Sequence, residues 1–155
     1  MTNTAYGSDT DKAFLEKARR YCAIAEQCES GVRQKLIGWG ASPDTLAPII
    51  EQLRAEGYLD DMRYARAYCE SKVLRQHWGR MKVVYQLRAK HFSRETIDRA
   101  MEAIGDEEYR RMLHETALRK RVELGSRPDA ERRVAAFLAS RGFSASEISQ
   151  EINLQ

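Results

Sequence analysis

The side chains best suited to a chemical task form a run of cations in the middle of the chain. Between residues 71 and 94 the sequence carries seven Lys and Arg residues and neither Asp nor Glu. A helix face that only keeps a protein soluble usually mixes both signs of charge, whereas an unmixed run of cations can hold a polyanion. The whole chain has 26 cations and 23 anions, a net charge of +3. The local distribution of charge therefore points to an anionic partner, with a merely solvated helix face as the alternative.

Residues for catalysis or metal binding form no recognisable constellation. The three histidines stand apart in the sequence, and there is no glycine-rich phosphate loop or nucleophile-elbow serine. Asp60 and Asp61 follow a turn, where an N-cap and the helix dipole account for two acids. Cys22 and Cys28 have the wrong spacing for a zinc knuckle and are expected to be small core residues. We expect a protein that is not an enzyme and needs no metal or other cofactor.

Composition limits the class of protein further. The 155 residues are 43% hydrophobic and 32% charged, which is typical of one or two compact domains. The longest unbroken apolar run, residues 134–139, is too short to cross a bilayer, and the N-terminus shows no secretory signal. Three cysteines, an odd number, give no disulfide framework. We expect a cytoplasmic protein that does not enter a membrane.

The elements that must position the cations follow an internal repeat. Apolar and Ser positions recur twice at an offset of about 51 residues, and a fixed period of this kind indicates a repeat architecture. The matching sets are Val32, Val83 and Val134; Leu36, Leu87 and Leu138; Ser42, Ser93 and Ser144; Leu46, Ile97 and Ile148; and Ile50, Met101 and Ile152. We interpret the chain as three diverged copies of one unit.

Each unit is predicted to consist of three helices. Apolar residues spaced i, i+4 lie on one helix face, and period-two alternation never persists. Ser42, Ser93 and Ser144 are N-cap candidates, and Ser144 with Glu147 fits a capping box. The predicted helices are 11–27, 29–38, 43–56, 60–76, 79–90, 93–104, 107–124, 128–141 and 144–153.

These helices predict an all-α fold. It consists of three tandem three-helix, helix-turn-helix-like repeats of about 51 residues in an elongated, curved array. The expected domain organisation is a disordered tail at 1–10, repeat 1 at 11–57, a basic repeat 2 at 58–108 and repeat 3 at 109–155.

Helix geometry indicates which residues of the basic repeat can reach a partner. At 100° per residue, Val83, Val84 and Leu87 form a core-facing arc, and Lys82 and Tyr85 point away from it. An outward Tyr beside outward cations suits phosphate contacts combined with stacking or a protein contact.

The other aromatic residues nearby are predicted to be structural. Trp78 lies at a corner between helices, where a large aromatic ring packs more often than it binds, and we expect it to be a buried hinge residue. Tyr64 and Tyr68 share a helix face at i, i+4 and are expected in the core.

Three segments of the sequence resemble a known family. They are residues 57–65 (GYLDDMRYA), 79–83 (GRMKV) and 86–90 (QLRAK). Together they resemble the central signature of the RecX family of bacterial recombination regulators. The resemblance implies tandem three-helix repeats and binding to the RecA recombinase, mostly as a filament on single-stranded DNA. Members of that family typically inhibit the ATPase, strand-exchange and co-protease activities of RecA, and they also bind DNA.

This resemblance, combined with the acid-free run, assigns candidate roles to residues. The partners expected are the RecA filament and single-stranded DNA, with double-stranded DNA open, for a monomer that modulates recombination and the SOS response. The expected DNA-contacting or RecA-contacting residues are Arg63, Arg66, Lys72, Arg75, Arg80, Lys82, Tyr85, Arg88 and Lys90. The expected structural signature residues are Gly57, Tyr58, Leu59, Asp60, Asp61 and Tyr64.

The chain departs from the family pattern at three positions. His91 replaces a common Gly, so either the turn avoids a positive φ or His adopts it at a cost. Cys28 stands where Ser would cap a helix, which is expected to weaken that start by roughly 1 kcal/mol. Gln86 stands where an acid is common.

Two other classes of protein are alternatives. A stand-alone helix-turn-helix DNA-binding protein would show a sequence preference and form a dimer on two half-sites. A helical scaffold that binds only protein would show no salt-dependent DNA binding.

Overall fold

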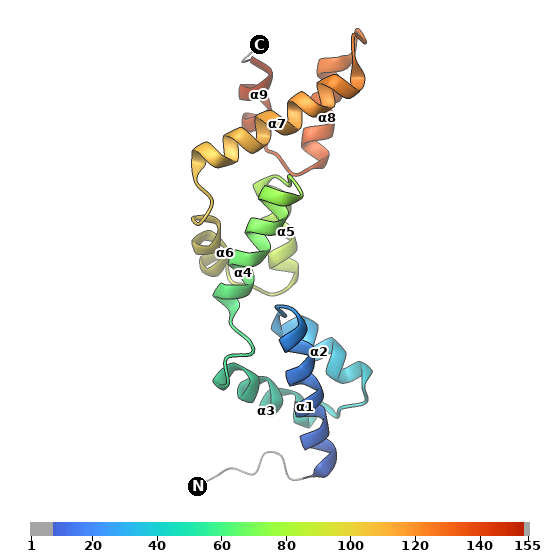
Figure 1. Cartoon of the computed structure of the whole chain (residues 1–155), viewed down its shortest axis with the longest axis vertical. Helices are drawn as coiled ribbons and strands as arrows, with labels where there is room; N and C mark the ends of the chain where they lie inside the picture. Colours follow the sequence, from blue (N-terminus) through green and yellow to red (C-terminus); the bar gives the residue numbers. More distant parts are fainter. Residues whose placement is uncertain (1–7, 154–155) are drawn as a thin grey trace. The chain divides into compact units, whose positions relative to one another are not determined.

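The computed structural model describes residues 8–153, and this part of the chain consists of helices and turns without a strand (Figure 1). The predicted all-α fold is therefore confirmed. The elements are α1 (Asp9–Ile24), α2 (Glu29–Gly38), α3 (Pro43–Ala55), α4 (Asp61–Cys69), η1 (Glu70–Arg75), α5 (Arg80–Ala89), α6 (Arg94–Met101), α7 (Asp106–Leu124), α8 (Ala130–Ser140) and α9 (Ala145–Asn153). They fall into two compact units, residues 1–64 and residues 65–155.

The helix boundaries lie within about three residues of the predicted ones, and two differences have a visible cause. Residues 1–7 of the expected tail lie outside the described residues, and α1 already begins at Asp9, because the Ser8 hydroxyl accepts a hydrogen bond from the Asp11 amide at 3.1 Å. The single helix predicted over 60–76 changes from α4 into the π-helical segment η1. There the amide of Gln76 donates to the carbonyl of Ser71, five residues back, at 3.1 Å.

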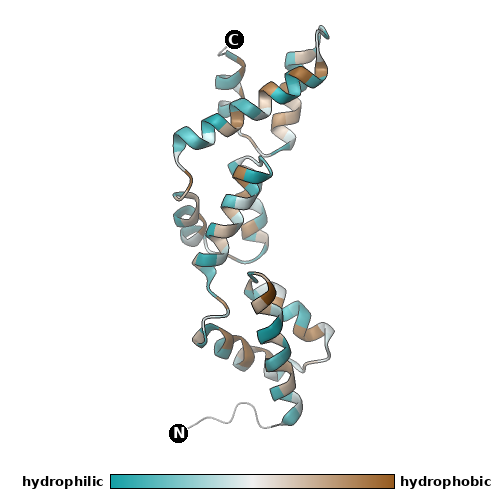
Figure 2. Ribbon diagram, in the orientation of Figure 1, coloured by the Kyte–Doolittle hydropathy of each residue, from teal (hydrophilic) through white to brown (hydrophobic). Residues whose placement is uncertain are grey.

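The first unit packs α1, α2 and α3 around one core. Every one of these helices carries both hydrophobic and hydrophilic residues (Figure 2), as expected for amphipathic helices with one buried face. The core residues are Leu15, Ala18, Cys22, Val32, Leu36, Ala41, Leu46, Ile49, Ile50, Leu53 and Leu59. Cys22 and Cys28 are buried, in agreement with their expected role as small core residues.

The second unit contains the remaining helices, and the sequence repeat defines its innermost positions. Val83 and Leu87 on α5 and Val134 and Leu138 on α8 are completely buried, as are their counterparts on α2. Burial is less uniform at the repeat positions that follow, since Met101, Ile148 and Ile152 are only partly buried. The second helix of each repeat thus supplies two completely buried core residues.

A left-handed turn ends this second helix in all three repeats. Gly40, His91 and Gly142 occupy equivalent positions of the repeats and have φ of +96°, +70° and +96°. The next residue is buried in each case, and its amide donates to the carbonyl five residues back, as in a Schellman motif; the Phe92 amide, for example, meets the Leu87 carbonyl at 3.1 Å. His91 therefore adopts the positive φ that Gly would take without strain.

The predicted N-caps are present in two of three cases. The Ser93 hydroxyl accepts from the Thr96 amide at 3.2 Å, and Ser144 and Glu147 form the reciprocal capping box. The Ser42 side chain makes no such bond; its carbonyl instead accepts from the Thr45 hydroxyl at 2.8 Å. Cys28 also caps α2 without a side-chain bond to a backbone amide of the helix, and its Sγ instead lies 3.3 Å from the Ser30 hydroxyl.

Two glycines allow a close contact within the second unit. The Gly79 amide donates to the Arg141 carbonyl at 2.8 Å, and the Met81 amide donates to the Gly142 carbonyl at 3.1 Å. A Cβ on Gly79 would lie 2.2 Å from the Gly142 backbone, and one on Gly142 would lie 2.3 Å from Cβ of Lys82. The start of α5, including Lys82, is therefore fixed against the turn that follows α8.

Candidate nucleic-acid interface

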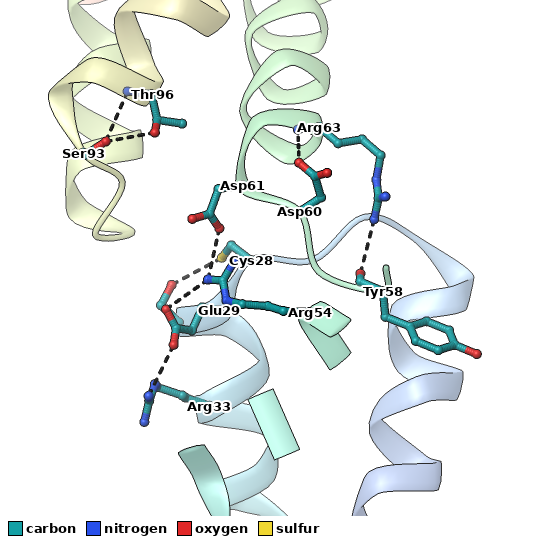
Figure 3. Close-up of polar contacts among 11 residues, drawn as sticks. Cys28, Glu29, Arg33, Arg54, Tyr58, Asp60, Asp61, Arg63, Ser93 and Thr96 are labelled. Atoms are coloured by element: carbon teal, nitrogen blue, oxygen red, sulfur yellow. Dashed lines mark hydrogen bonds and ion pairs between the residues drawn. The ribbon is translucent and has the colours of Figure 1, made fainter. Parts of the chain in front are cut away.

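The signature segment, residues 57–63, is held together by polar contacts of its own (Figure 3). The Asp60 carboxylate accepts a hydrogen bond from the Arg63 amide at 2.9 Å and so caps α4. The Arg63 guanidinium donates to Glu26 at 2.5 Å and to the Gly57 carbonyl at 2.9 Å. Arg63, which was expected to contact a partner, therefore has its Nε and Nη2 donors engaged inside the first unit.

A second arginine binds the acids around this segment. Arg54 lies 3.2 Å from Asp61 and 3.3 Å from Glu29, and Glu29 also pairs with Arg33 at 3.3 Å. Isolated surface pairs contribute little to stability, but a guanidinium shared by two carboxylates fixes the geometry of both. The two adjacent acids, Asp60 and Asp61, thus have structural partners, as their position after a turn indicated.

The acid-free run builds a different environment, which we call the lysine–aromatic cluster: Tyr68, Lys72, Trp78, Lys82 and Lys90. The Lys72 and Lys82 ammonium groups lie 4.7 and 4.2 Å from the centroid of the Trp78 ring. Lys72 and Lys90 also lie 5.4 and 6.0 Å from the Tyr68 ring. These residues come from α4, η1, α5 and the turns beside them, so the fold gathers cations that are well separated in the sequence.

The three lysines of the cluster keep their charge unneutralised. Within residues 8–153 none of them forms an ion pair with a carboxylate, and Lys72 has only the Gln76 side-chain oxygen at 3.4 Å. A cation held over an aromatic face is stabilised by the quadrupole of the ring, which carries no net charge. The cluster therefore presents three positive charges beside two rings.

The aromatic residues of this region are less buried than expected. Trp78, expected to be a buried hinge residue, is half-buried and has two ammonium groups over its ring. Tyr64 and Tyr68 are also half-buried, and the core positions beside them are taken by Ala65 and Cys69. The small residues on that face pack inward, which leaves the larger rings near the surface.

Of the other candidate residues in the second unit, Arg80 is firmly held. Its guanidinium lies 3.8 Å from the centroid of the Tyr109 ring and 3.1 Å from Asp106, and its backbone amide donates to the Tyr109 hydroxyl at 3.1 Å. Burial raises the pKa of Tyr109, so the phenol stays protonated. Arg80 thus joins α5 to α7.

The remaining candidates are exposed. Tyr85 is 71% exposed, in agreement with its outward position on α5, whereas Val84 of the expected core arc is only half-buried. Arg66, Arg75 and Arg88 are exposed and have no carboxylate partner within the described part of the chain.

The described residues contain neither a metal-binding group of three His, Cys, Asp or Glu side chains nor a helix long and apolar enough to span a membrane. These residues form an all-helical, tandem-repeat protein with a basic and aromatic surface on its second repeat.

Comparison with known proteins identifies the family. Residues 60–101 match the model of the second three-helix domain of RecX. The chain is 31% identical over 147 residues to the regulatory protein RecX of Prosthecochloris aestuarii, with 94% of this chain and 95% of that protein covered. It is 31% identical over 141 residues to the regulatory protein RecX of Halorhodospira halophila, with 88% and 84% covered. The chain belongs to the RecX family.

Solved structures agree in fold. The crystal structure of RecX from Lactobacillus salivarius is similar to this chain with a TM-score of 0.81 at 19% identity, covering 94% of this chain and 96% of that one. A further crystal structure of regulatory protein RecX gives a TM-score of 0.85 at 23% identity, covering 95% and 74%.

Sequence reasoning missed two features of the interface. It assigned Trp78 to the core, although Lys72 and Lys82 flank this residue in the sequence closely enough to reach its ring. It also counted Arg63 and Arg80 with the free cations, because sequence alone does not pair Arg63 with Glu26, 37 residues away.

Proposed function

We propose that this chain is a regulator of RecA that binds the RecA nucleoprotein filament and DNA. Through this binding it inhibits the recombinase, ATPase and co-protease activities of RecA, and so modulates homologous recombination and the SOS response in the cytoplasm. Membership of the RecX family supports the regulatory role. The observation that carries the DNA-binding part is the lysine–aromatic cluster, whose three ammonium groups lie beside the rings of Tyr68 and Trp78 and pair with no carboxylate of residues 8–153.

The chemistry of the cluster favours a single strand. Phosphates approach the ammonium groups and release counterions, so affinity falls as salt rises. Aromatic rings stack on unpaired bases, which a duplex does not offer. Lys72 and Lys82 lie over Trp78 on flexible stems, and a phosphate can draw them from the ring at little cost.

RecA activity on single-stranded DNA tests the proposal. The ATPase rate is measured with rising amounts of the protein, and DNA binding without RecA is measured alongside. We expect inhibition at amounts well below those that coat the DNA. Unchanged turnover with DNA binding retained would instead indicate a stand-alone DNA-binding protein, and unchanged turnover without DNA binding would leave a protein-only scaffold.

Two variants show whether the cluster is responsible. Lys72, Lys82 and Lys90 are changed together to Gln, which removes three unpaired charges. The matched control changes Arg94, Arg99 and Arg110 to Gln, of which the first two are neutralised on α6 by Asp98 and Glu95. Inhibition is expected to be lost in the first variant and retained in the second.

A further inference from the structure

The lysine–aromatic cluster has a counterpart one repeat earlier in the chain. In the second repeat the Lys90 ammonium lies 6.0 Å from the Tyr68 ring. The equivalent positions in the first repeat are Trp39 and Lys17, and there the Lys17 ammonium lies 4.5 Å from the Trp39 ring. The cation and the ring have exchanged places, but the same two positions form the same kind of pair.

The first repeat extends this pair into a cluster between α1 and α2, which we call the α1–α2 cluster: Lys17, Tyr21, Lys35 and Trp39. Lys35 lies 5.5 Å from the Tyr21 ring, and Tyr21 and Trp39 meet edge to face at 6.0 Å. Neither lysine pairs with a carboxylate among residues 8–153. A second group of unneutralised cations on aromatic rings therefore exists outside the acid-free run.

The third repeat has a basic cavity at the same position. Arg119 and Arg141 are the equivalents of the pair in the other repeats, and both line a cavity of about 250 Å³ between η1, α7 and α8. Arg75 lines it as well. Lys120 lies 4.8 Å from the Phe137 ring on its wall and pairs with Glu123 at 3.0 Å.

The cations that line the cavity outnumber the one carboxylate that lines it among residues 8–153, Glu123, which is paired with Lys120. Arg141 donates to the Gln76 carbonyl, and its Nε is buried without a hydrogen-bond partner. Arg75 and Arg119 are exposed and have no carboxylate partner within the described range. On the cavity wall, burial and then the charge of Arg119 lower the pKa of His77, so the positive charge of the cavity comes from its Arg and Lys side chains.

We propose that the first and third repeats each carry a contact site for single-stranded nucleic acid, equivalent to the lysine–aromatic cluster of the second repeat. This inference rests on the proposed function and extends it from one repeat to all three. The α1–α2 cluster takes a base on its rings and a phosphate on its lysines, whereas the cavity of the third repeat takes a phosphate alone. Every nucleotide of a single strand carries the same kinds of group, a phosphate and a base. Such a polymer can therefore offer a phosphate or a base to a site on each repeat.

The two tryptophans allow each cluster to be observed separately. Trp39 belongs to the α1–α2 cluster and Trp78 to the lysine–aromatic cluster. Trp78→Phe leaves Trp39 as the only tryptophan, and Trp39→Phe leaves Trp78. Each protein is titrated with oligothymidylate. Stacking of a base is expected to quench the fluorescence of both tryptophans, and added salt is expected to restore it.

Charge removal tests the first and third sites directly. The variants are Lys17→Gln with Lys35→Gln, and Arg75→Gln with Arg119→Gln. Each is expected to weaken oligothymidylate binding on the order of tenfold and to lower the salt slope by about 1.4, because each phosphate contact on a single strand contributes about 0.7. The matched controls are Lys12→Gln with Arg20→Gln on α1, and Arg110→Gln with Arg111→Gln on α7, all exposed. These controls are expected to bind within about twofold of the parent protein.

The possible outcomes separate this inference from the proposed function. Quenching of Trp78 without quenching of Trp39, together with wild-type affinity in both charge variants, would overturn the inference and leave the proposed function standing. Loss of RecA inhibition without loss of oligonucleotide affinity would also overturn it, since the sites would then serve a protein partner. Absence of any DNA binding would overturn both. Circular dichroism melting checks that each variant is folded.

Discussion

The signature segment and the lysine–aromatic cluster are both rich in cations, but they use them in opposite ways. In the signature segment, Arg63 donates to a carboxylate and to a backbone carbonyl, and Arg54 is shared by two carboxylates. In the cluster, Lys72 and Lys82 lie over the Trp78 ring, and no carboxylate of the described residues pairs with them. The family match over residues 60–101 thus covers two kinds of cation: Arg63, which holds the chain together, and the lysines of the cluster, which no carboxylate of residues 8–153 neutralises.

The type of partner explains this difference. A guanidinium has five donors in a rigid fork, which suits fixed contacts with several acceptors at once. An ammonium on a flexible stem over a ring keeps its full charge and moves easily. Counting cations therefore does not locate a binding surface; the acceptors around each cation decide its role.

The largest expected effect compares the two regions directly. Changing Lys72, Lys82 and Lys90 together to Gln is expected to weaken single-stranded DNA binding at least about a hundredfold at moderate salt, with a salt slope lower by about 2, since three phosphate contacts are lost. Arg63→Gln is expected to leave both quantities unchanged. Fluorescence anisotropy at several salt concentrations measures the affinity and the salt slope. Equal losses in the two proteins would mean that Arg63 and the cluster lysines do not differ in role.

The next effect concerns the contact that fixes Lys82. Gly142→Ala places a Cβ 2.3 Å from Cβ of Lys82 and forces Ala to a φ of +96°. Overpacking and backbone strain together are expected to lower the free energy of unfolding by roughly 2 to 3 kcal/mol. Gly40→Ala has the same φ but nothing within 4 Å, so only about 1 kcal/mol is expected there.

Urea unfolding of both variants measures this difference. If the two glycine substitutions cost the same, the close approach of α5 to the turn after α8 would not contribute to stability. If Gly142→Ala also weakens DNA binding while Gly40→Ala does not, the contact positions the cluster as well as the fold.

Much of the fold could be predicted from the sequence because buried and helix-capping residues recur at a fixed offset. Val83 and Leu87 recur in register with the buried residues of α2 and α8, and Ser93 caps a helix as its position indicated. The π-helical segment was not predicted, because the hydrogen bond from the Gln76 amide to the Ser71 carbonyl, five residues back, leaves no periodic mark in so short a segment.

The candidate site followed from the sequence only in part. The acid-free run located the lysines, but the partners of Arg63 and Arg80 lie 37 and 26 residues away, beyond any local pattern. The α1–α2 cluster lies in a region of mixed charge, where acidic residues are interspersed with the cations and no long unmixed run includes Lys17 or Lys35. Applying the offset of the repeat to Tyr68 and Lys90 would have found it.

A smaller effect tests the structural role of the signature segment. Asp60→Ala removes the carboxylate that accepts the Arg63 amide at 2.9 Å. Loss of this N-cap is expected to lower the free energy of unfolding by about 1 kcal/mol, with DNA affinity unchanged. Asp60→Asn is the control, since its side-chain oxygen caps the helix equally well. A loss of DNA affinity in Asp60→Ala alone would show that this segment does more than hold the fold.

A stabilising change is expected beside the cluster. His91 has a φ of +70° directly after Lys90, where the equivalent positions carry Gly40 and Gly142. Relief of left-handed strain, less the greater chain entropy of Gly, is expected to raise the free energy of unfolding by roughly 0.5 to 1 kcal/mol in His91→Gly. Thermal and urea unfolding measure this change. A destabilised His91→Gly protein would mean that the imidazole makes a contact that outweighs the strain.

The smallest expected effect is a pH-dependent change in stability at Glu56, next to the signature segment. The Arg19 guanidinium donates to Glu56 at 2.7 Å, and Gln52 donates to the same carboxylate at 2.6 Å. These hydrogen bonds, that of Arg19 first, lower the pKa of Glu56 from 4.5 to about 2. Because the folded state binds this proton more weakly than the unfolded state, the stabilisation is present above about pH 4.5 and is lost as the pH falls toward about 2.

The pair is solvent-accessible, so its contribution is expected to stay below about 1 kcal/mol. Arg19→Gln removes this pair together with the longer one that Arg19 makes with Glu16 at 3.3 Å. The difference in unfolding free energy between this variant and the parent protein is expected to be largest near neutral pH and to shrink toward about pH 2, as Glu56 becomes protonated in both. A difference that stays constant over this range would mean that Arg19 stabilises α1 by packing and not through Glu56. The lysines of the cluster pair with no carboxylate between residues 8 and 153, so Lys72→Gln is expected to show no such acid dependence and provides the matched comparison.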